Sequence, residues 1–296
     1  MTGTQAQGRP AVDERAVQRS VEARRTFAGL VRSEWLKLRT LRSTCWTLGL
    51  VVAMQIAMAV TEGASLATSY PDGIGSHGAT TLASLAAGGV SATQFAVMVL
   101  GVLCVTGEYR TGQVRSTFNA DPGRVLVLAA KGVVVAGLTF ITSFAAMVVS
   151  GVVLRVMAGD LAAGMSYLDL TAVRITVGAP LYLSLIALMS LALGAALRRA
   201  GAAICAVLVI VMALPGTASM FPGGWVGTLV SYLPGSAGAA IYDAGATVAD
   251  STLNPMAAAM GGGTVMLPAW LGLLVLAGWV ALIWGWGVSA TQRRDV

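Results

Sequence analysis

The stretch Glu108-Tyr109-Arg110-Thr111-Gly112 begins a polar, basic segment that extends to Lys131 and separates two long apolar runs of the sequence. Apolar runs of this length cross membranes, so the polar segment between them has to lie in water. Its cations are Arg110, Arg115, Arg124 and Lys131. Because Lys and Arg accumulate in the cytoplasmic loops of membrane proteins, the sequence predicts that this 108–131 segment is a cytoplasmic loop.

The composition of the whole chain is that of a membrane protein. Of its 296 residues, 56% are hydrophobic and 11% are charged, and the mean hydropathy is +0.77. A soluble domain carries roughly 25% charged residues. The net charge of +6 comes from cations before the first apolar run and beside the later ones, where they can contact lipid headgroups. We therefore predict an all-α polytopic membrane protein with no nucleic-acid partner.

Six apolar runs each approach the ~20 residues that a membrane-spanning helix needs. They cover residues 44–61, 88–107, 132–154, 175–197, 201–221 and 267–288, and they define one six-span domain, 44–288. Pro180 inside the fourth run and Pro215 inside the fifth are expected to kink their helices and loosen the backbone hydrogen bonding there. With both termini in the cytoplasm, 17 of the 19 Lys and Arg residues lie inside and only Arg155 and Arg174 lie outside. This asymmetry predicts a multi-pass protein of the cell membrane with cytoplasmic ends.

The regions outside the spans are interpreted from their composition. Residues 1–26 are polar and have little to bury, which is typical of a disordered tail, and residues 289–296 are expected to form a short cytoplasmic tail. The last outer loop, 222–266, contains no Lys or Arg but many apolar side chains. This composition favours short helices against the outer membrane surface over a solvated linker.

Residues 27–43 show the period of an amphipathic helix. Apolar side chains recur at spacings of three and four from Phe27 to Leu41, and cations surround them. Because the first span follows directly, we predict a helix in the plane of the inner membrane surface with its apolar face towards lipid. An ordinary helix packed on another element is the alternative. The residues assigned to the surface of this helix are Trp35, Lys37, Arg39 and Arg42.

The sequence lacks the motifs that bring catalysis or nucleotide binding. It contains no G-x-x-x-x-G-K-[ST] phosphate loop, no HExxH, no CxxC and no GxSxG. Its single histidine is His77. We therefore expect this chain to be no enzyme, and to carry no catalytic residues, no metal site and no cofactor of its own.

The centres of the predicted spans contain no Asp, Glu, Lys, Arg or His, which argues against an ion-coupled transporter. Polar side chains do occur there, and they either touch a substrate or form hydrogen bonds between helices. They are Gln55, Gln94, Thr139, Thr142, Ser143, Ser184 and Ser190.

Within the 108–131 segment, residues 110–119 can form a short helix with Val114 and Phe118 on one side. Asp121-Pro122-Gly123 then turns the chain, because Pro and Gly suit the central positions of a turn. A short helix with an apolar patch in a basic frame is a compact docking surface for a soluble partner. A solvated loop that obeys the positive-inside rule is the alternative.

Several motifs resemble those of ABC type-2 transporter permeases. In the 108–131 segment, Glu108-Tyr109-Arg110-Thr111-Gly112, Arg115-Ser116-Thr117, Pro122-Gly123-Arg124 and Lys131 are similar to the cytoplasmic loop of this family. Residues 33–43 (SEWLKLRTLRS) are similar to the N-terminal interfacial helix of its actinobacterial members. The span number, the orientation and the long last outer loop match as well. Gly123 departs from the pattern, because many relatives have a second basic residue there.

This resemblance implies that the chain is the permease subunit of an ATP-driven exporter and forms its substrate path. The implied partners are a cytoplasmic ABC ATP-binding subunit that holds ATP and Mg, a second permease copy or a related permease, the lipid bilayer and an exported substrate. The 108–131 segment would couple to the ATPase, with Glu108 and Gly112 as its E-x-x-x-G motif. The residues implied in coupling are Glu108, Tyr109, Arg110, Gly112, Val114, Arg115, Phe118, Arg124 and Lys131. A self-contained channel or secondary transporter, and a membrane anchor for a cytoplasmic protein, are the alternatives.

Overall fold

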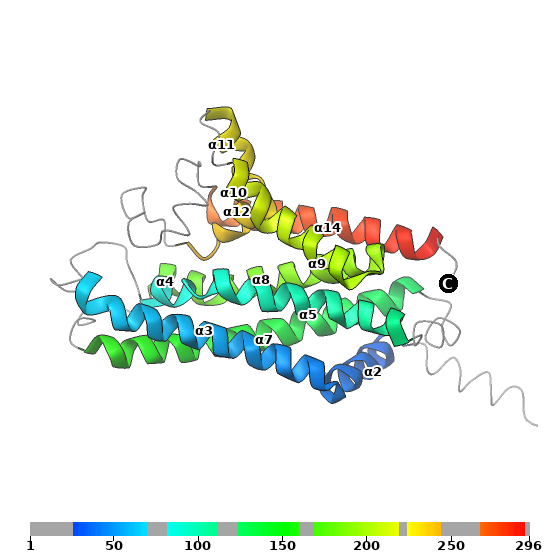
Figure 1. The fold of residues 1–296 in the computed structure, drawn as a ribbon, viewed down its shortest axis with the longest axis horizontal. Helices are drawn as coiled ribbons and strands as arrows, with labels where there is room; N and C mark the ends of the chain where they lie inside the picture. Colours follow the sequence, from blue (N-terminus) through cyan, green and yellow to red (C-terminus); the bar gives the residue numbers. More distant parts are fainter. Residues whose placement is uncertain are drawn as a thin grey trace, which may run out of the picture.

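The computed structural model describes residues 26–69, 82–111, 124–159, 169–218, 224–243 and 267–293 (Figure 1). Every regular element within these ranges is a helix, and six helical segments are long and apolar enough to cross a membrane. The predicted all-α, six-span fold is therefore confirmed. The six segments are α3 (Arg42–Ser69), α5 (Val90–Thr111), α7 (Arg124–Ala158), α8 (Leu170–Leu197), the continuous run of α9 (Ala200–Leu208), η3 (Val209–Ala213) and α10 (Leu214–Ala218), and α14 (Ala269–Arg293).

Four shorter helices complete the described part of the chain. They are α2 (Phe27–Thr40), α4 (Leu82–Ala87), α11 (Gly224–Ser231) and α12 (Pro234–Ala239). The last two lie in the long loop where short helices were predicted. The predicted tail at 1–26 falls outside the described residues except for Thr26, whose hydroxyl accepts a hydrogen bond from the Gly29 amide and caps α2.

Several helices extend beyond the predicted apolar runs. The third span begins at Arg124 and not at residue 132, and α14 continues to Arg293, into the residues predicted as a tail. Helical hydrogen bonding does not stop where the apolar sequence stops, so a span read from hydropathy is shorter than its helix. Consequently Lys131 lies inside α7, and only residues 112–123 separate α5 from α7.

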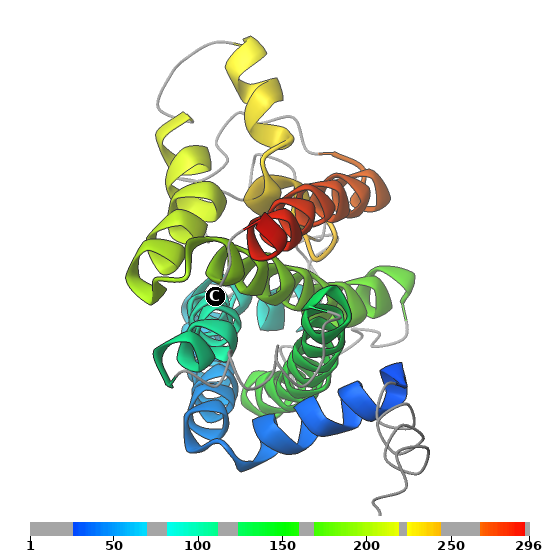
Figure 2. The same cartoon turned by 90° about the vertical axis from the view of Figure 1, so that its right-hand side faces the viewer.

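The spans form a bundle around α8. Helices α5 and α7 pack along α8, α3 packs on α5 and α7, and α14 packs on α8 from the other side (Figure 1). Among the spans α8 is the most deeply buried. Seen along the bundle, the run from α9 to α10 leans away from the other helices (Figure 2). Helix α2 lies across the ends of α3 and α7 (Figure 2).

Candidate functional site

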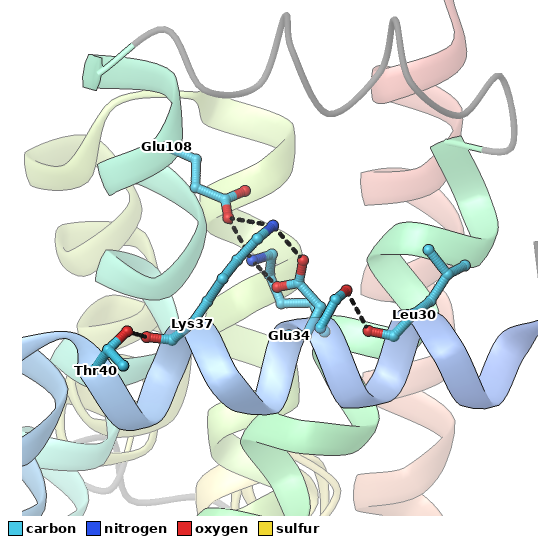
Figure 3. Close-up of polar contacts among 7 residues, drawn as sticks. Leu30, Glu34, Lys37, Thr40 and Glu108 are labelled. Carbon is cyan, nitrogen blue, oxygen red and sulfur yellow. Dashed lines mark hydrogen bonds and ion pairs between the residues drawn. The ribbon is translucent and has the colours of Figure 1, made fainter. Parts of the chain in front are cut away.

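A cluster of four charged side chains lies where α2 crosses the bundle (Figure 3). We call Glu34, Lys37, Glu108 and Lys131 the charge cluster. Glu34 and Lys37 come from α2, Glu108 from the last turn of α5, and Lys131 from the second turn of α7. The cluster therefore joins three helices, and two of them are the helices on either side of residues 112–123.

Lys131 is the centre of the charge cluster. Its ammonium donates to Glu34 Oε2 at 2.5 Å and to Glu108 Oε1 at 2.8 Å. Lys37 donates to the other Glu34 oxygen, Oε1, at 2.6 Å, and its ammonium lies 3.7 Å from Glu108 Oε1. Two carboxylates thus face two ammonium groups, and the charge cluster is neutral as a whole.

Burial makes this pairing necessary. The side chains of Glu34 and Lys131 are 2% and 4% exposed, Glu108 is 16% exposed, and Lys37 reaches towards solvent at 40%. Removing a charge from water is costly unless an opposite charge and hydrogen bonds replace the water. Because Lys131 has a carboxylate from α2 and another from α5, neither α2 nor α5 can move away without leaving a buried ammonium poorly paired.

The pKa of Glu34 reflects both its burial and its pairing with the two lysines. Burial alone would raise the pKa of this carboxyl, but Lys131 and Lys37 act against burial through their charge and their hydrogen bonds. The net result is a pKa below the usual value for glutamate. Glu34 is therefore ionised at neutral pH and holds both lysines.

The local sequence of α2 explains how Glu34 reaches the bundle. Glu34 and Leu38 are one helical turn apart and are the two buried side chains of this helix, and Val31, one turn earlier, packs against the core. Lys37, three residues after Glu34, lies at the edge of the same face, where the two side chains pair. The buried face of α2 thus carries one carboxylate among apolar side chains.

The predicted apolar face of α2 is divided in the structure. Leu38 is buried against the bundle, whereas Phe27, Trp35 and Leu41 are between 40% and 48% exposed. The prediction of one apolar face directed at lipid was therefore wrong for Leu38. The helix has a buried face that holds Glu34 and an exposed face with Trp35, Arg39 and, just beyond its end, Arg42.

The structure brings together some of the residues assigned to the coupling segment. Glu108 and Lys131 belong to the charge cluster together with Lys37 of α2. The Tyr109 ring lies beneath the Arg198 guanidinium, 5.3 Å from its centroid to the guanidinium carbon. Arg110 belongs to α5 and Arg124 begins α7, and their side chains are not among those that the structure describes. Gly112, Val114, Arg115 and Phe118, the predicted short helix around them and the turn at 121–123 also lie outside the described residues.

Two findings correct the interpretation of the sequence. Lys131 was expected at the end of a solvated loop, yet it is buried inside α7 because two carboxylates neutralise it there. Glu34 was missed altogether. A signal for it was present, since a carboxylate stands between Val31 and Leu38 on the apolar face of α2 and has a lysine three residues later.

The polar side chains inside the spans mostly connect helices or bond to their own helix. Gln55 of α3 donates to the Ala86 carbonyl and accepts from Thr93, while Ser150 of α7 donates to the Gln55 carbonyl. Tyr182 of α8 donates to the Gln94 amide oxygen at 2.6 Å. For Gln55 and Gln94 the structure therefore favours hydrogen bonds between elements over contact with a substrate.

The charge cluster joins α2, α5 and α7 through ion pairs. In the part of the chain that the structure describes, no three His, Cys, Asp or Glu side chains gather closely enough to hold a metal ion. No protein-family model and no curated protein matches this chain.

Proposed function

We propose that this chain is the membrane subunit of an ATP-driven exporter of the ABC type-2 kind, and that a separate cytoplasmic ATPase drives it. The observation that carries this proposal is the buried link from α2 to both Glu108 and Lys131. The two elements that the family resemblance implies next to the ATPase, namely the N-terminal helix and the 108–131 segment, are physically one unit through these ion pairs.

The position of the charge cluster suits the transmission of force. Glu108 lies four residues before residue 112 and Lys131 eight residues after residue 123, so both ends of the 112–123 connection are held by the charge cluster, in which Lys131 pairs with Glu34 and with Glu108. An ATPase that pushes on residues 112–123 would move α5, α7 and α2 together. ATP binding can shift the arrangement of the spans only if it favours one arrangement over another, and a rigid junction makes such a preference possible.

The distribution of cations supports the orientation that this function requires. The charge cluster and Arg198, which lies beside Tyr109, are at the same end of the bundle as the exposed Arg32, Arg39 and Arg42. Basic residues of membrane proteins face the cytoplasm. In the proposed complex this end faces the ATP-binding subunit, both termini are cytoplasmic, the membrane is the cell membrane, and a second permease completes the substrate path.

The first experiment is co-purification from native membranes in mild detergent with a tag at the C-terminus. The intact chain is compared with a variant in which residues 110–119 are scrambled, and bound proteins are identified by mass spectrometry. We expect the intact chain to retain an ATP-binding subunit and the scrambled chain to lose it. If neither well-folded protein retains an ATPase, the chain acts as a self-contained channel or as an anchor.

A further inference from the structure

Thr139 and Ser143 stand out among the polar side chains of the spans. They lie one turn apart on the buried face of α7, and their exposures are 0% and 4%. Within the described residues neither hydroxyl has a hydrogen-bond partner. Native structures rarely leave buried polar atoms in this condition, and each exception needs a physical explanation.

Other buried hydroxyls in the spans show what is unusual here. Thr106, Ser184 and Ser190 each donate to the carbonyl four residues earlier in their own helix. Thr139 and Ser143 could bond in the same way, but neither hydroxyl forms a hydrogen bond to the carbonyl four residues earlier. Because neither hydroxyl bonds to the backbone carbonyl four residues earlier, the two together form a small polar region in the interior of the bundle.

We propose that Thr139 and Ser143 bind buried water inside the bundle. A buried water makes two to four hydrogen bonds to groups that would otherwise be unsatisfied. Each hydroxyl can donate one and accept two, so the pair supplies two of these bonds from neighbouring turns. Leaving both hydroxyls dry would cost more free energy than the immobilisation of one water molecule.

The proposed water site lies between two groups of buried polar contacts. Thr139 lies about 12 Å along α7 from Lys131, and Ser143 lies about 10 Å before Ser150, which bonds to Gln55. The site thus falls between the charge cluster and the hydrogen bonds of Gln55, on one buried face of α7. It makes the interior of a single subunit partly polar and hydrated, apart from any path between two subunits, and it holds whether or not the chain is an exporter.

The test is a double-mutant cycle with Thr139→Val and Ser143→Ala, measured as melting temperatures of the full-length protein in nanodiscs. If the two hydroxyls share water, each variant lowers the melting temperature, and the double variant lowers it by less than the sum of the single shifts. Ser190→Ala is the matched control, since it removes a buried hydroxyl that bonds within its own helix. If the site is dry, removal of either hydroxyl raises the melting temperature or leaves it unchanged, and the proposal fails.

A second measurement works on the unmodified protein. X-ray radiolysis in water labelled with oxygen-18 produces hydroxyl radicals from bound water, and these oxidise neighbouring side chains. Met147 lies one turn beyond Ser143 and is 3% exposed. We expect labelled oxygen on Met147 in the intact protein and in the Ser190→Ala control, and its loss in the double variant. No labelling of Met147 in the intact protein, or equal labelling in the double variant, overturns the proposal.

Discussion

Lys131 illustrates how one residue can decide the arrangement of three helices. Its ammonium is nearly enclosed, and its partners come from α2 and α5. A buried ion pair is not by itself a source of stability, because desolvation offsets much of the attraction. The ion pair instead gives the observed arrangement of the helices a lower free energy than displaced arrangements. Any displacement would leave a buried charge unpaired in apolar surroundings. We interpret the charge cluster as a device for fixing the position of α2.

Replacing Lys131 alone should therefore be more damaging than removing the whole pair. Lys131→Met leaves Glu34 buried with Lys37 as its only cation, and we expect a loss of about 3–5 kcal/mol in the free energy of unfolding. The double variant Glu34→Gln with Lys131→Met removes the charge on both sides and should recover most of that loss. Denaturant unfolding in detergent micelles, followed by circular dichroism, measures both.

Lys37→Met is the control for this comparison. Its side chain is 40% exposed, and an ion pair of this exposure contributes little, on the order of 0–1 kcal/mol. A Lys131→Met protein as stable as the parent would show that the cluster does not hold the helices. A double variant no better than the single one would show that packing of the lysine stem matters more than its charge.

The charge of Glu34 also predicts a dependence on pH. Its pKa in the folded protein is below the usual value of 4.5, so folding favours the ionised form. The stability that comes from this group is complete above the unfolded pKa and is lost as the pH falls through the folded pKa. The neighbours that share this environment are Lys131, Lys37 and Glu108.

We expect the melting temperature of the parent protein to fall between about pH 5 and pH 3 more steeply than that of Glu34→Gln. The two curves should approach each other at the acid end, where Glu34 is protonated in the parent. Parallel curves over this range would mean that acid acts elsewhere in the molecule and that Glu34 has no altered pKa.

Three of the four members of the charge cluster could be named from sequence, but not their relationship. Lys37, Glu108 and Lys131 were assigned to two separate surfaces because they lie in segments more than 60 residues apart. Their contact depends on where each helix ends and on how α2 crosses the bundle. The hydropathy of the sequence predicts neither of these. Glu34 was overlooked since a single carboxylate on an apolar stripe has no visible partner in sequence.

Among the elements, the irregular turn between α9 and α10 has a local cause. Pro215 has no amide proton to donate to the Val211 carbonyl four residues earlier. The helix widens there into the π-turn η3, in which the Leu214 amide bonds to the Val209 carbonyl. Gly235 of α12 packs directly against the Val211 carbonyl, where a Cβ would collide with it. The irregular turn and the short helix therefore fit each other.

This fit predicts that Gly235→Ala is destabilising. The added methyl would meet backbone atoms of η3, which cannot turn aside as a flexible side chain can. We expect a cost of about 1–3 kcal/mol, typical of overpacking, seen as a lower melting temperature. Gly201→Ala in α9 is the control, because a Cβ there meets nothing within 4 Å and alanine favours a helix. Equal melting temperatures for the two variants would contradict close packing of α12 on η3.

The elements themselves were predictable from sequence, while their faces and ends were less so. Runs of about 20 apolar residues specify spans because a bilayer demands them, and all six were found. The start of α7 was missed by eight residues, since Arg124 and Lys131 look like loop residues until their surroundings are known. The face of α2 was misjudged because lipid and a protein bundle both accept apolar side chains.

For the molecule as a whole, the two cations assigned to the outer side have structural uses there. Arg174 donates to the carbonyls of Ala240 and Asp243 and so fixes the end of α12, and Arg155 donates to the Gly159 carbonyl at the end of α7. Guanidinium groups near helix C-termini satisfy free carbonyls. These two exceptions are consistent with the orientation that the other cations predict.

Cysteine labelling tests this orientation. In a background without Cys45, Cys104 and Cys205, single cysteines are placed at Leu170, an exposed residue at the start of α8, and at Gln292, an exposed residue near the end of α14. A membrane-impermeant maleimide applied to intact cells should label the first and not the second, while permeabilised cells should label both. Labelling of Gln292→Cys in intact cells would show that the molecule has the opposite orientation. The charge cluster would then not face the cytoplasm, as the exporter proposal requires.

Glu108 connects the charge cluster to the proposed function. In Glu108→Ala, Lys131 keeps Glu34, so α2 stays attached, but α5 loses its link to both lysines. We expect normal insertion and normal recovery of the ATP-binding subunit, with ATP hydrolysis per assembled complex reduced several-fold because residues 112–123 no longer act on α5 and α2 together. Glu62→Ala is the matched control, since Glu62 lies 20 residues along α3 from Arg42, about 30 Å away. Hydrolysis equal to the parent's in Glu108→Ala, at equal complex yield, would leave the cluster as a purely structural clamp and would place coupling elsewhere on the cytoplasmic face.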